Sequence, residues 1–506
     1  MRILPVIVLL FSVLTMSGFA DDAVTTGWYY LNDLRRQAGL VRLERSDPLQ
    51  AAAQKHSHYM QKHHTAGHDE TEGTEDFYGK KSLDRALKAG YRSRMVSENL
   101  SAGQSDIKSS IDGLLAAIYH RFGFLSLDVD EIGIGVEGKY YTYDMGNMLL
   151  DQLCQRESYT GSDTVIYDVC KDENKKIKYQ DYHNAKNHYK ADTNAPSVIL
   201  WPPVNGSPVP PAFYEETPDP LPDYGVSGYP VSVEFNDARF SSAPDPEKIT
   251  LYLENDEGNQ LEGIPFSGKE FMTKGNDPQK HLTAYQFALF PEKRLEWGHA
   301  YYATLGYGDE EFQWCFTTQS LADRGVDRVY RFDDGDAAER TVVSGTKYAL
   351  YFVPQHSNDA FHGYSISKRY YDTAPTESIE FLDWNTLLFS IDGKEGDTIT
   401  LTVRHDDGAE QTITLKVSGG DTADIPARAT CGDAAGEGSI DPSGISDIEK
   451  EPDPDTGTSS DGRSDTSGIS RGNSPAASSA GGYPSVMMFL MMVLGMIGLV
   501  RRVERG

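Results

Sequence analysis

Apolar residues in the N-terminal part of the chain recur at the three- and four-residue spacing of an α-helix. The first series ends at Gly39 and consists of Trp28, Leu31, Leu34 and Ala38. A second series follows Ser46-Asp47-Pro48, which favours the start of a helix, and a third covers about 106–121. These spacings predict three amphipathic helices.

Other segments carry the signals of β-structure. Residues 131–146 alternate between apolar and polar positions, which predicts a hairpin with its turn at Glu137-Gly138-Lys139. Beyond residue 198 the apolar runs are short and separated by Pro, Gly and Asn, which favours β-sandwiches. The strands predicted there are 231–235, 249–254, 285–289, 300–305, 313–318, 398–404 and 412–417.

These patterns together predict an α+β chain of several domains. A mixed helix-and-strand unit comes first, then a polar connector, then two all-β sandwich domains. The corresponding ranges are 23–150, 151–197, 198–320 and 322–430.

The N-terminus has the pattern of a secretory signal. Arg2 supplies the positive charge, residues 3–16 are mostly apolar, and Gly18-Phe19-Ala20 offers small residues for cleavage after Ala20. We therefore expect residues 1–20 to be removed on export.

Export to an oxidising compartment predicts that the four cysteines pair. Cys154 and Cys170 are close in sequence, so we expect them to close a local loop. Cys315 with Cys431 would then join distant segments, although three pairings are open from sequence alone.

Charge narrows the set of partners. The chain has 47 Lys+Arg against 76 Asp+Glu, a formal net charge of −29. Nucleic acids and anionic lipid surfaces would be repelled, so neither is expected as a partner. A highly charged soluble surface in salty surroundings is the simpler interpretation.

The C-terminal part has two further segments. Residues 432–482 are rich in Ser, Gly, Asp and Pro, the composition of a disordered stalk. Residues 483–506 contain an apolar run at 486–500 followed by arginines. With Gly481-Gly482 ahead of it, this tail resembles the sorting signals that a rhomboid-type protease, rhombosortase, processes in Gram-negative bacteria. The alternative is a permanent tail anchor, and both place the protein outside the inner membrane.

Several short motifs occur in a characteristic order in the first domain. They are LNDLRRQAG at 31–39, a histidine-rich run ending at His68, SENL at 97–100, IYHRFGFL at 118–125 and EIGIGVEGKYYTYDMGN at 131–147. This series resembles the bacterial branch of the CAP superfamily (cysteine-rich secretory proteins, antigen 5 and pathogenesis-related proteins). The resemblance implies an α-β-α sandwich. Residues 314–318, WCFTT, resemble the end of bacterial Ig-like modules.

The CAP resemblance also implies a cleft lined by histidine and glutamate. His68, Glu98 and His120 match positions of the family motifs. The late-strand histidine of eukaryotic members is absent, and we expect Tyr141 or Asp144 to line the cleft instead. His68 and His120 with a carboxylate could hold Zn²⁺ or another divalent metal, with Glu70 or Glu98 as a base.

Two functions from different classes follow. In the first, the cleft binds an extracellular lipid, glycan or peptide without turnover, and His68, Glu98 and His120 form a hydrogen-bonded cluster. In the second, it is a metal-dependent hydrolase or protease. A purely structural role in adhesion is a third possibility. Of the other histidines in this region, we expect His56 and His63 in the core and His58 and His64 in solvent.

Overall fold

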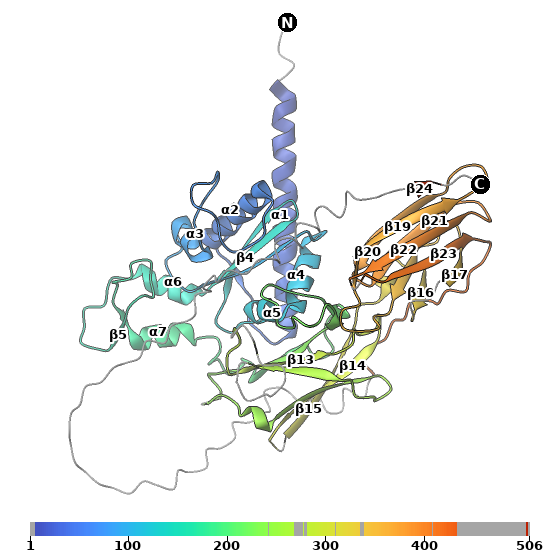
Figure 1. The fold of residues 1–506 in the computed structure, drawn as a ribbon. Coiled ribbons are helices and arrows are strands. Elements are labelled where there is room, and N and C mark those ends of the chain that lie inside the picture. The colour runs from blue at the N-terminus through green and yellow to red at the C-terminus, as the bar shows by residue number, and fades with distance from the viewer. Residues whose placement is uncertain are drawn as a thin grey trace. The chain divides into compact units, whose positions relative to one another are not determined.

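A computed structural model describes residues 6–240, 242–267, 277, 281–308, 310–333, 338–406, 408–432 and 502–503 of the chain (Figure 1). All of these residues belong to one compact unit. The predicted stalk and the sorting signal at Gly481-Gly482 lie outside the described residues.

The first domain mixes helices with a four-stranded sheet of order β1-β3-β4-β2 (Figure 1). Its elements are α1 (Val6–Gln37), β1 (Glu44–Arg45), α2 (Asp47–His63), α3 (Ser82–Ala89), β2 (Val96–Ala102), α4 (Ile107–Ala116), α5 (Ile118–Phe124), β3 (Glu131–Glu137) and β4 (Tyr140–Gly146). The helix starting at Ser46-Asp47-Pro48 and the hairpin are confirmed. α1 ends before Gly39, as predicted, and it also includes most of the predicted export signal.

Helices cover both faces of this sheet. On one face α2 approaches so closely that a Cβ at Gly133 or Gly135 would lie about 2 Å from its backbone. The motif EIGIGV therefore has glycine where the helix crosses. On the other face, the ring of Tyr143 packs against Phe124, with centroids 5.1 Å apart, and its hydroxyl bonds to Ser110 of α4. This is the layered arrangement that the resemblance implied.

The single helix predicted at 106–121 is wrong. Ala117 has extended backbone angles (φ −77°, ψ 120°) and separates α4 from α5. The carboxylate of Glu216 accepts hydrogen bonds from the backbone N–H groups of Ile118 (2.5 Å) and Tyr119 (3.2 Å). A side chain nearly a hundred residues away thus satisfies the first donors of α5, which helical periodicity alone could not reveal.

The connector is a small folded segment. Its elements are α6 (Met148–Gln155), β5 (Val165–Ile166), β6 (Ile177–Lys178) and α7 (Tyr179–Lys186). Cys154 and Cys170 form the predicted disulfide, with Cα atoms 5.5 Å apart. The helix α6 crosses the boundary drawn at residue 150.

The following region is β-rich, and its first part has two main sheets, of order β12-β13-β10-β7 and β11-β14-β15. Its elements are β7 (Val198–Trp201), β8 (Ala212–Phe213), β9 (Ser227–Gly228), β10 (Val231–Phe235), the 3₁₀ turn η1 (Pro246–Lys248), β11 (Ile249–Asn255), β12 (Gly263–Ser267), β13 (Gln286–Pro291), β14 (Ala300–Tyr307) and β15 (Glu310–Thr317). All five strands predicted here are present, within a few residues at their ends. The Ig-like identity stays a prediction.

The last part also has two sheets, of order β16-β18-β21-β20 and β17-β23-β22-β19-β24. Its elements are the 3₁₀ turn η2 (Leu321–Arg324), β16 (Arg328–Phe332), β17 (Ala338–Val342), β18 (Tyr348–Phe352), β19 (Phe361–Arg369), β20 (Thr376–Asp383), β21 (Thr386–Asp392), β22 (Thr398–His405), β23 (Glu410–Val417) and β24 (Arg502–Val503). Buried side chains from both sheets form one core. Cys315 and Cys431 form the second disulfide.

Among the helices that the structure describes, none combines the length and the apolar character needed to cross a membrane.

Candidate functional site

The site is centred on a pair formed by His68 and Glu98. Helix α2 ends where His64 adopts a left-handed conformation (φ 50°), and the chain then turns toward β2. Nδ1 of His68 lies 2.9 Å from Oε1 of Glu98. The His68 side chain is 49% exposed, whereas that of Glu98 is only 2% exposed. A half-exposed imidazole is therefore hydrogen-bonded directly to a buried carboxylate.

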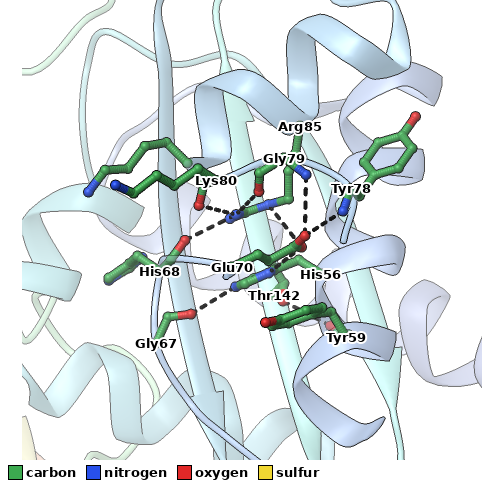
Figure 2. Close-up of polar contacts among 12 residues, drawn as sticks. His56, Tyr59, Gly67, His68, Glu70, Tyr78, Gly79, Lys80, Arg85 and Thr142 are labelled. Atoms are coloured by element: carbon green, nitrogen blue, oxygen red, sulfur yellow. Dashed lines mark hydrogen bonds and ion pairs between the residues drawn. The ribbon is translucent and has the colours of Figure 1, made fainter. Parts of the chain in front are cut away.

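Arg85 binds the Glu98 carboxylate from its buried side. Its Nη2 donates to Oε2 of Glu98 at 2.6 Å. Its Nη1 donates to the backbone carbonyls of His68, Gly79 and Lys80 (Figure 2). Burial opposes ionisation of Glu98, but the hydrogen bond from His68 and the charge of Arg85 lower its pKa to about 2. Glu98 is therefore placed to accept hydrogen bonds through both of its carboxylate oxygens.

A second buried carboxylate, Glu70, organises the loop next to this site. It accepts hydrogen bonds from the backbone N–H groups of Tyr78 and Gly79 and from Nδ1 of His56, 3.0 Å away (Figure 2). Nε2 of His56 faces the carbonyl of Gly67 at 2.9 Å. Burial opposes ionisation here too, yet these donors lower the pKa of Glu70. With no exposed oxygen, Glu70 supports the loop that carries His68.

Asp144 lies opposite Glu98 in the β2–β4 pairing and is fully buried. Burial raises its pKa well above the usual range, and the charge of Glu98 raises it further. No nitrogen or hydroxyl donor among the described residues reaches either Asp144 oxygen. Two acidic side chains therefore lie together in the interior, and the charge of Arg85 opposes the effect of Glu98 on the pKa of Asp144.

His120 has a different partner. Its Nδ1 lies 2.9 Å from Oε2 of Glu216, and its backbone carbonyl accepts a hydrogen bond from the side chain of Asn99. Neighbouring residues of a strand point to opposite faces, so Asn99 and Glu98 serve opposite sides of the sheet. The structure thus brings His68 and Glu98 into contact, while His120 is bonded to a residue of the following β-rich region.

Tyr141 also lies away from the pair. It is 3% exposed, and its hydroxyl donates to the carbonyl of Gln104. Because Tyr141 and Asp144 are three positions apart on β4, their side chains point to opposite faces. The histidines of α2 are distributed as expected, with His56 buried, His63 half-buried, and His58 and His64 exposed.

Within the part of the chain that the structure describes, no three His, Cys, Asp or Glu side chains gather in a group that would hold a metal ion. The proposed ligands His68 and His120 are each bonded to a different carboxylate. Open zinc sites need three protein ligands and a free position, so this arrangement gives the metal hypothesis no support.

The sequence interpretation missed Arg85 and Glu216. Arg85 occupies an ordinary position on a short amphipathic helix, and nothing in the local pattern distinguishes a buried arginine from an exposed one. Glu216 lies in the loop between β8 and β9, and its role exists only once that loop meets α5.

A titration of this domain tests its buried charge. Burial raises the pKa of Glu131 to about 7, and the charges of Asp130 and Asp151 act in the same direction against the hydrogen bond from Tyr91. The folded state therefore holds a proton that the unfolded state, with a value of 4.5, releases earlier. We expect this group to cost up to about 3 kcal/mol of stability between about pH 5 and pH 8.

The substitution Glu131→Gln should remove this loss, because an amide keeps the Tyr91 hydrogen bond without titrating. The measurement is guanidinium unfolding at both pH values. Glu137→Gln, on the exposed end of the same strand, is the matched control. Equal pH dependence in the wild type and Glu131→Gln would contradict the assignment.

One part of the chain matches a known protein family. Residues 28–149 match the family described as "CAP: Cysteine-rich secretory protein family", which is less than half of the chain. A search of curated proteins gave no match.

Three of the solved structures with similarity to this chain come from bacteria. An extracellular protein containing an SCP domain from Bacillus anthracis is 22% identical, with a TM-score of 0.23 over 25% of this chain and 40% of that one. An outer surface protein of Borrelia burgdorferi is 18% identical, with a TM-score of 0.22 over 25% and 92%. A cysteine-rich secretory protein of Staphylococcus aureus is 20% identical, with a TM-score of 0.20 over 25% and 39%. The chain thus spans 40% of the length of the first. On the family match and the motifs, residues 28–149 form a CAP domain.

Proposed function

We propose that this is an exported, surface-displayed protein whose CAP domain binds an extracellular ligand at His68 without turnover. The observation that carries the proposal is the half-exposed His68 ring fixed on a buried, ionised Glu98. Because Nδ1 is bonded to Glu98, the nitrogen left to face a ligand is Nε2, for which the described residues provide no recorded partner. A pre-oriented imidazole of this kind suits specific hydrogen bonding to a lipid, glycan or peptide.

The same geometry speaks against the hydrolase alternative. A general base is effective when its pKa is near the working pH, whereas the pKa of Glu98 is about 2. Glu70 is buried and its pKa is lowered as well. Neither carboxylate is therefore suited to activating water.

Export is proposed on two grounds. The N-terminal pattern is that of a signal cleaved after Ala20, and the two disulfides are typical of oxidising compartments. The proposal of surface display is based on the sequence of the C-terminal tail. The proposed partner of this tail is a sorting protease that cleaves near Gly481-Gly482. Mass spectrometry of the released protein should find a C-terminus near these glycines, and an intact 486–500 segment would contradict processing.

Binding can be tested with the purified exported chain and three probes: phosphatidylcholine vesicles, soluble neutral polysaccharides and casein peptides. We expect one probe to bind, and to bind at least about tenfold more weakly to His68→Ala, a loss of about 1.4 kcal/mol. His58→Ala is the matched control, because that ring is 47% exposed on the same domain.

Equal affinity of the wild type and His68→Ala for every probe would refute binding at His68. Metal analysis of the same preparation distinguishes ligand binding from the alternative of a metal-dependent hydrolase. Stoichiometric zinc that is lost from a His68→Ala, His120→Ala double variant would favour the hydrolase instead.

A further inference from the structure

The last β-rich part carries a continuous group of partly exposed rings, here called the aromatic platform: His362, Tyr364, Phe381 and Trp384. The His362 and Trp384 rings have centroids 4.0 Å apart. Phe381 lies 5.7 Å from Trp384 and 5.7 Å from Tyr364. Phe381 is 38% exposed, which is unusual for a phenylalanine.

Both strands that carry the platform are interrupted beside it. The pairing of β19 with β22 shifts register between Phe361 and Gly363, so His362 is an extra residue in its strand. The pairing of β20 with β21 shifts between Phe381 and Asp383, and Trp384 lies in the turn that follows β20. Bulges re-aim side chains and are frequent next to functional sites. Two bulges beside one aromatic group therefore indicate that the strands are shaped to expose these rings, and that the exposure is not a packing defect of the core.

The platform rests on a rigid base. Fully buried Phe361 packs under Phe381, with ring centroids 5.8 Å apart. Next to Trp384, Asp383 accepts a hydrogen bond from the buried Arg294 at 2.5 Å, and the side chain of Asn385 donates to the carbonyl of Asp359. The rings are thus held in place before any ligand arrives, which lowers the entropic cost of binding.

The polar groups at the edge of the platform narrow the ligand class. Nδ1 of His362 lies 2.7 Å from Oδ1 of Asp406, and the two side chains are 35% and 34% exposed. An exposed carboxylate accepts hydrogen bonds from hydroxyl groups and repels anions, and the net charge of −29 adds to that repulsion. A suitable ligand therefore has an apolar face for the rings, hydroxyl groups at its rim and no negative charge.

We propose that the aromatic platform is a binding site for a neutral polysaccharide. The C–H face of a sugar ring packs on Phe381 and Trp384, and its hydroxyl groups donate to Asp406. This site is separate from His68, so the CAP domain and the last β-rich part would recognise different ligands or different parts of one surface.

The test is affinity gel electrophoresis of the full exported chain in gels containing β-glucan, xyloglucan, galactomannan or amylopectin. We expect at least one polysaccharide to retard the wild type. Phe381→Ala and Trp384→Ala should each raise the dissociation constant about tenfold, as expected for the loss of a stacked ring. Tyr371→Ala is the matched control, because this tyrosine is 91% exposed and lies outside the ring series.

Thermal melting of each variant shows whether it is folded. If Trp384→Ala does not fold, Phe381→Ala still tests the proposal, because Phe381 is at an exposed position. Three results would overturn the proposal: no retardation by any of the four polysaccharides, unchanged affinity in both folded variants, or binding of casein peptides in place of sugar. Retardation that disappears in His68→Ala and persists in Trp384→Ala would place the sugar in the CAP domain and would also overturn it.

Discussion

Replacing Arg85 with alanine is expected to lower the free energy of unfolding of the CAP domain by about 3–5 kcal/mol. The Arg85 side chain is fully buried and lies between two carboxylates, 2.6 Å from Glu98 and 3.8 Å from Glu70. Its loss would leave Glu98 buried without its counter-charge and three backbone carbonyls without their shared donor. The measurement is guanidinium unfolding followed by circular dichroism.

The matched control is Arg36→Ala on α1, because this arginine pairs with Asp33 while its side chain is 73% exposed. Exposed pairs of this kind contribute about 1 kcal/mol or less. Arg85→Lys should fall between the two, since an ammonium group cannot donate in the directions of a planar guanidinium. Equal stability of Arg85→Ala and Arg36→Ala would show that the Arg85 cluster is not a stabilising centre.

Removing the Cys315–Cys431 disulfide is expected to cost about 4–5 kcal/mol. The two cysteines are 116 positions apart, so the bond restricts a long loop of the unfolded chain. Cys315 is fully buried on β15, and the chain near Cys431 is held nearby by hydrogen bonds from Ala429 to Gly298 and from Ser320 to Ala427. The measurement is guanidinium unfolding of Cys315→Ala, Cys431→Ala, followed by tryptophan fluorescence.

The other disulfide provides the comparison. Cys154 and Cys170 are only 16 positions apart, and a loop of that length predicts a smaller loss of about 3 kcal/mol for Cys154→Ala, Cys170→Ala. The order of the two losses is the decisive result. A larger loss for the shorter loop would show that packing around the bonds, rather than loop length, dominates.

Much of the secondary structure was predictable because it depends on local spacing. The helix at Ser46-Asp47-Pro48 and the strand at Val231–Phe235 follow from residue types that lie within one element. The helix predicted at 106–121 failed for the opposite reason, since its break at Ala117 depends on Glu216.

The candidate site was predictable only in part. Motif order singled out His68 and Glu98, and the structure places them 2.9 Å apart. Motif order also singled out His120, but which carboxylate a histidine meets depends on how the elements pack. Glu98 and Asn99 are adjacent in sequence yet serve opposite faces of one sheet, so His120 pairs with Glu216 instead.

The sequence by itself determined several of the helices and strands, the four cysteines available for pairing and the residues of one polar pair, because periodicity, cysteine positions and motifs are properties of the chain. The tertiary structure alone decided which charges are buried and which partners they have. Arg85 is an unremarkable helix residue until α3 packs on the sheet, and the pKa of Glu98 then follows from burial, His68 and Arg85 together. Such energies depend on distances between residues far apart in the chain, and no local pattern encodes those distances.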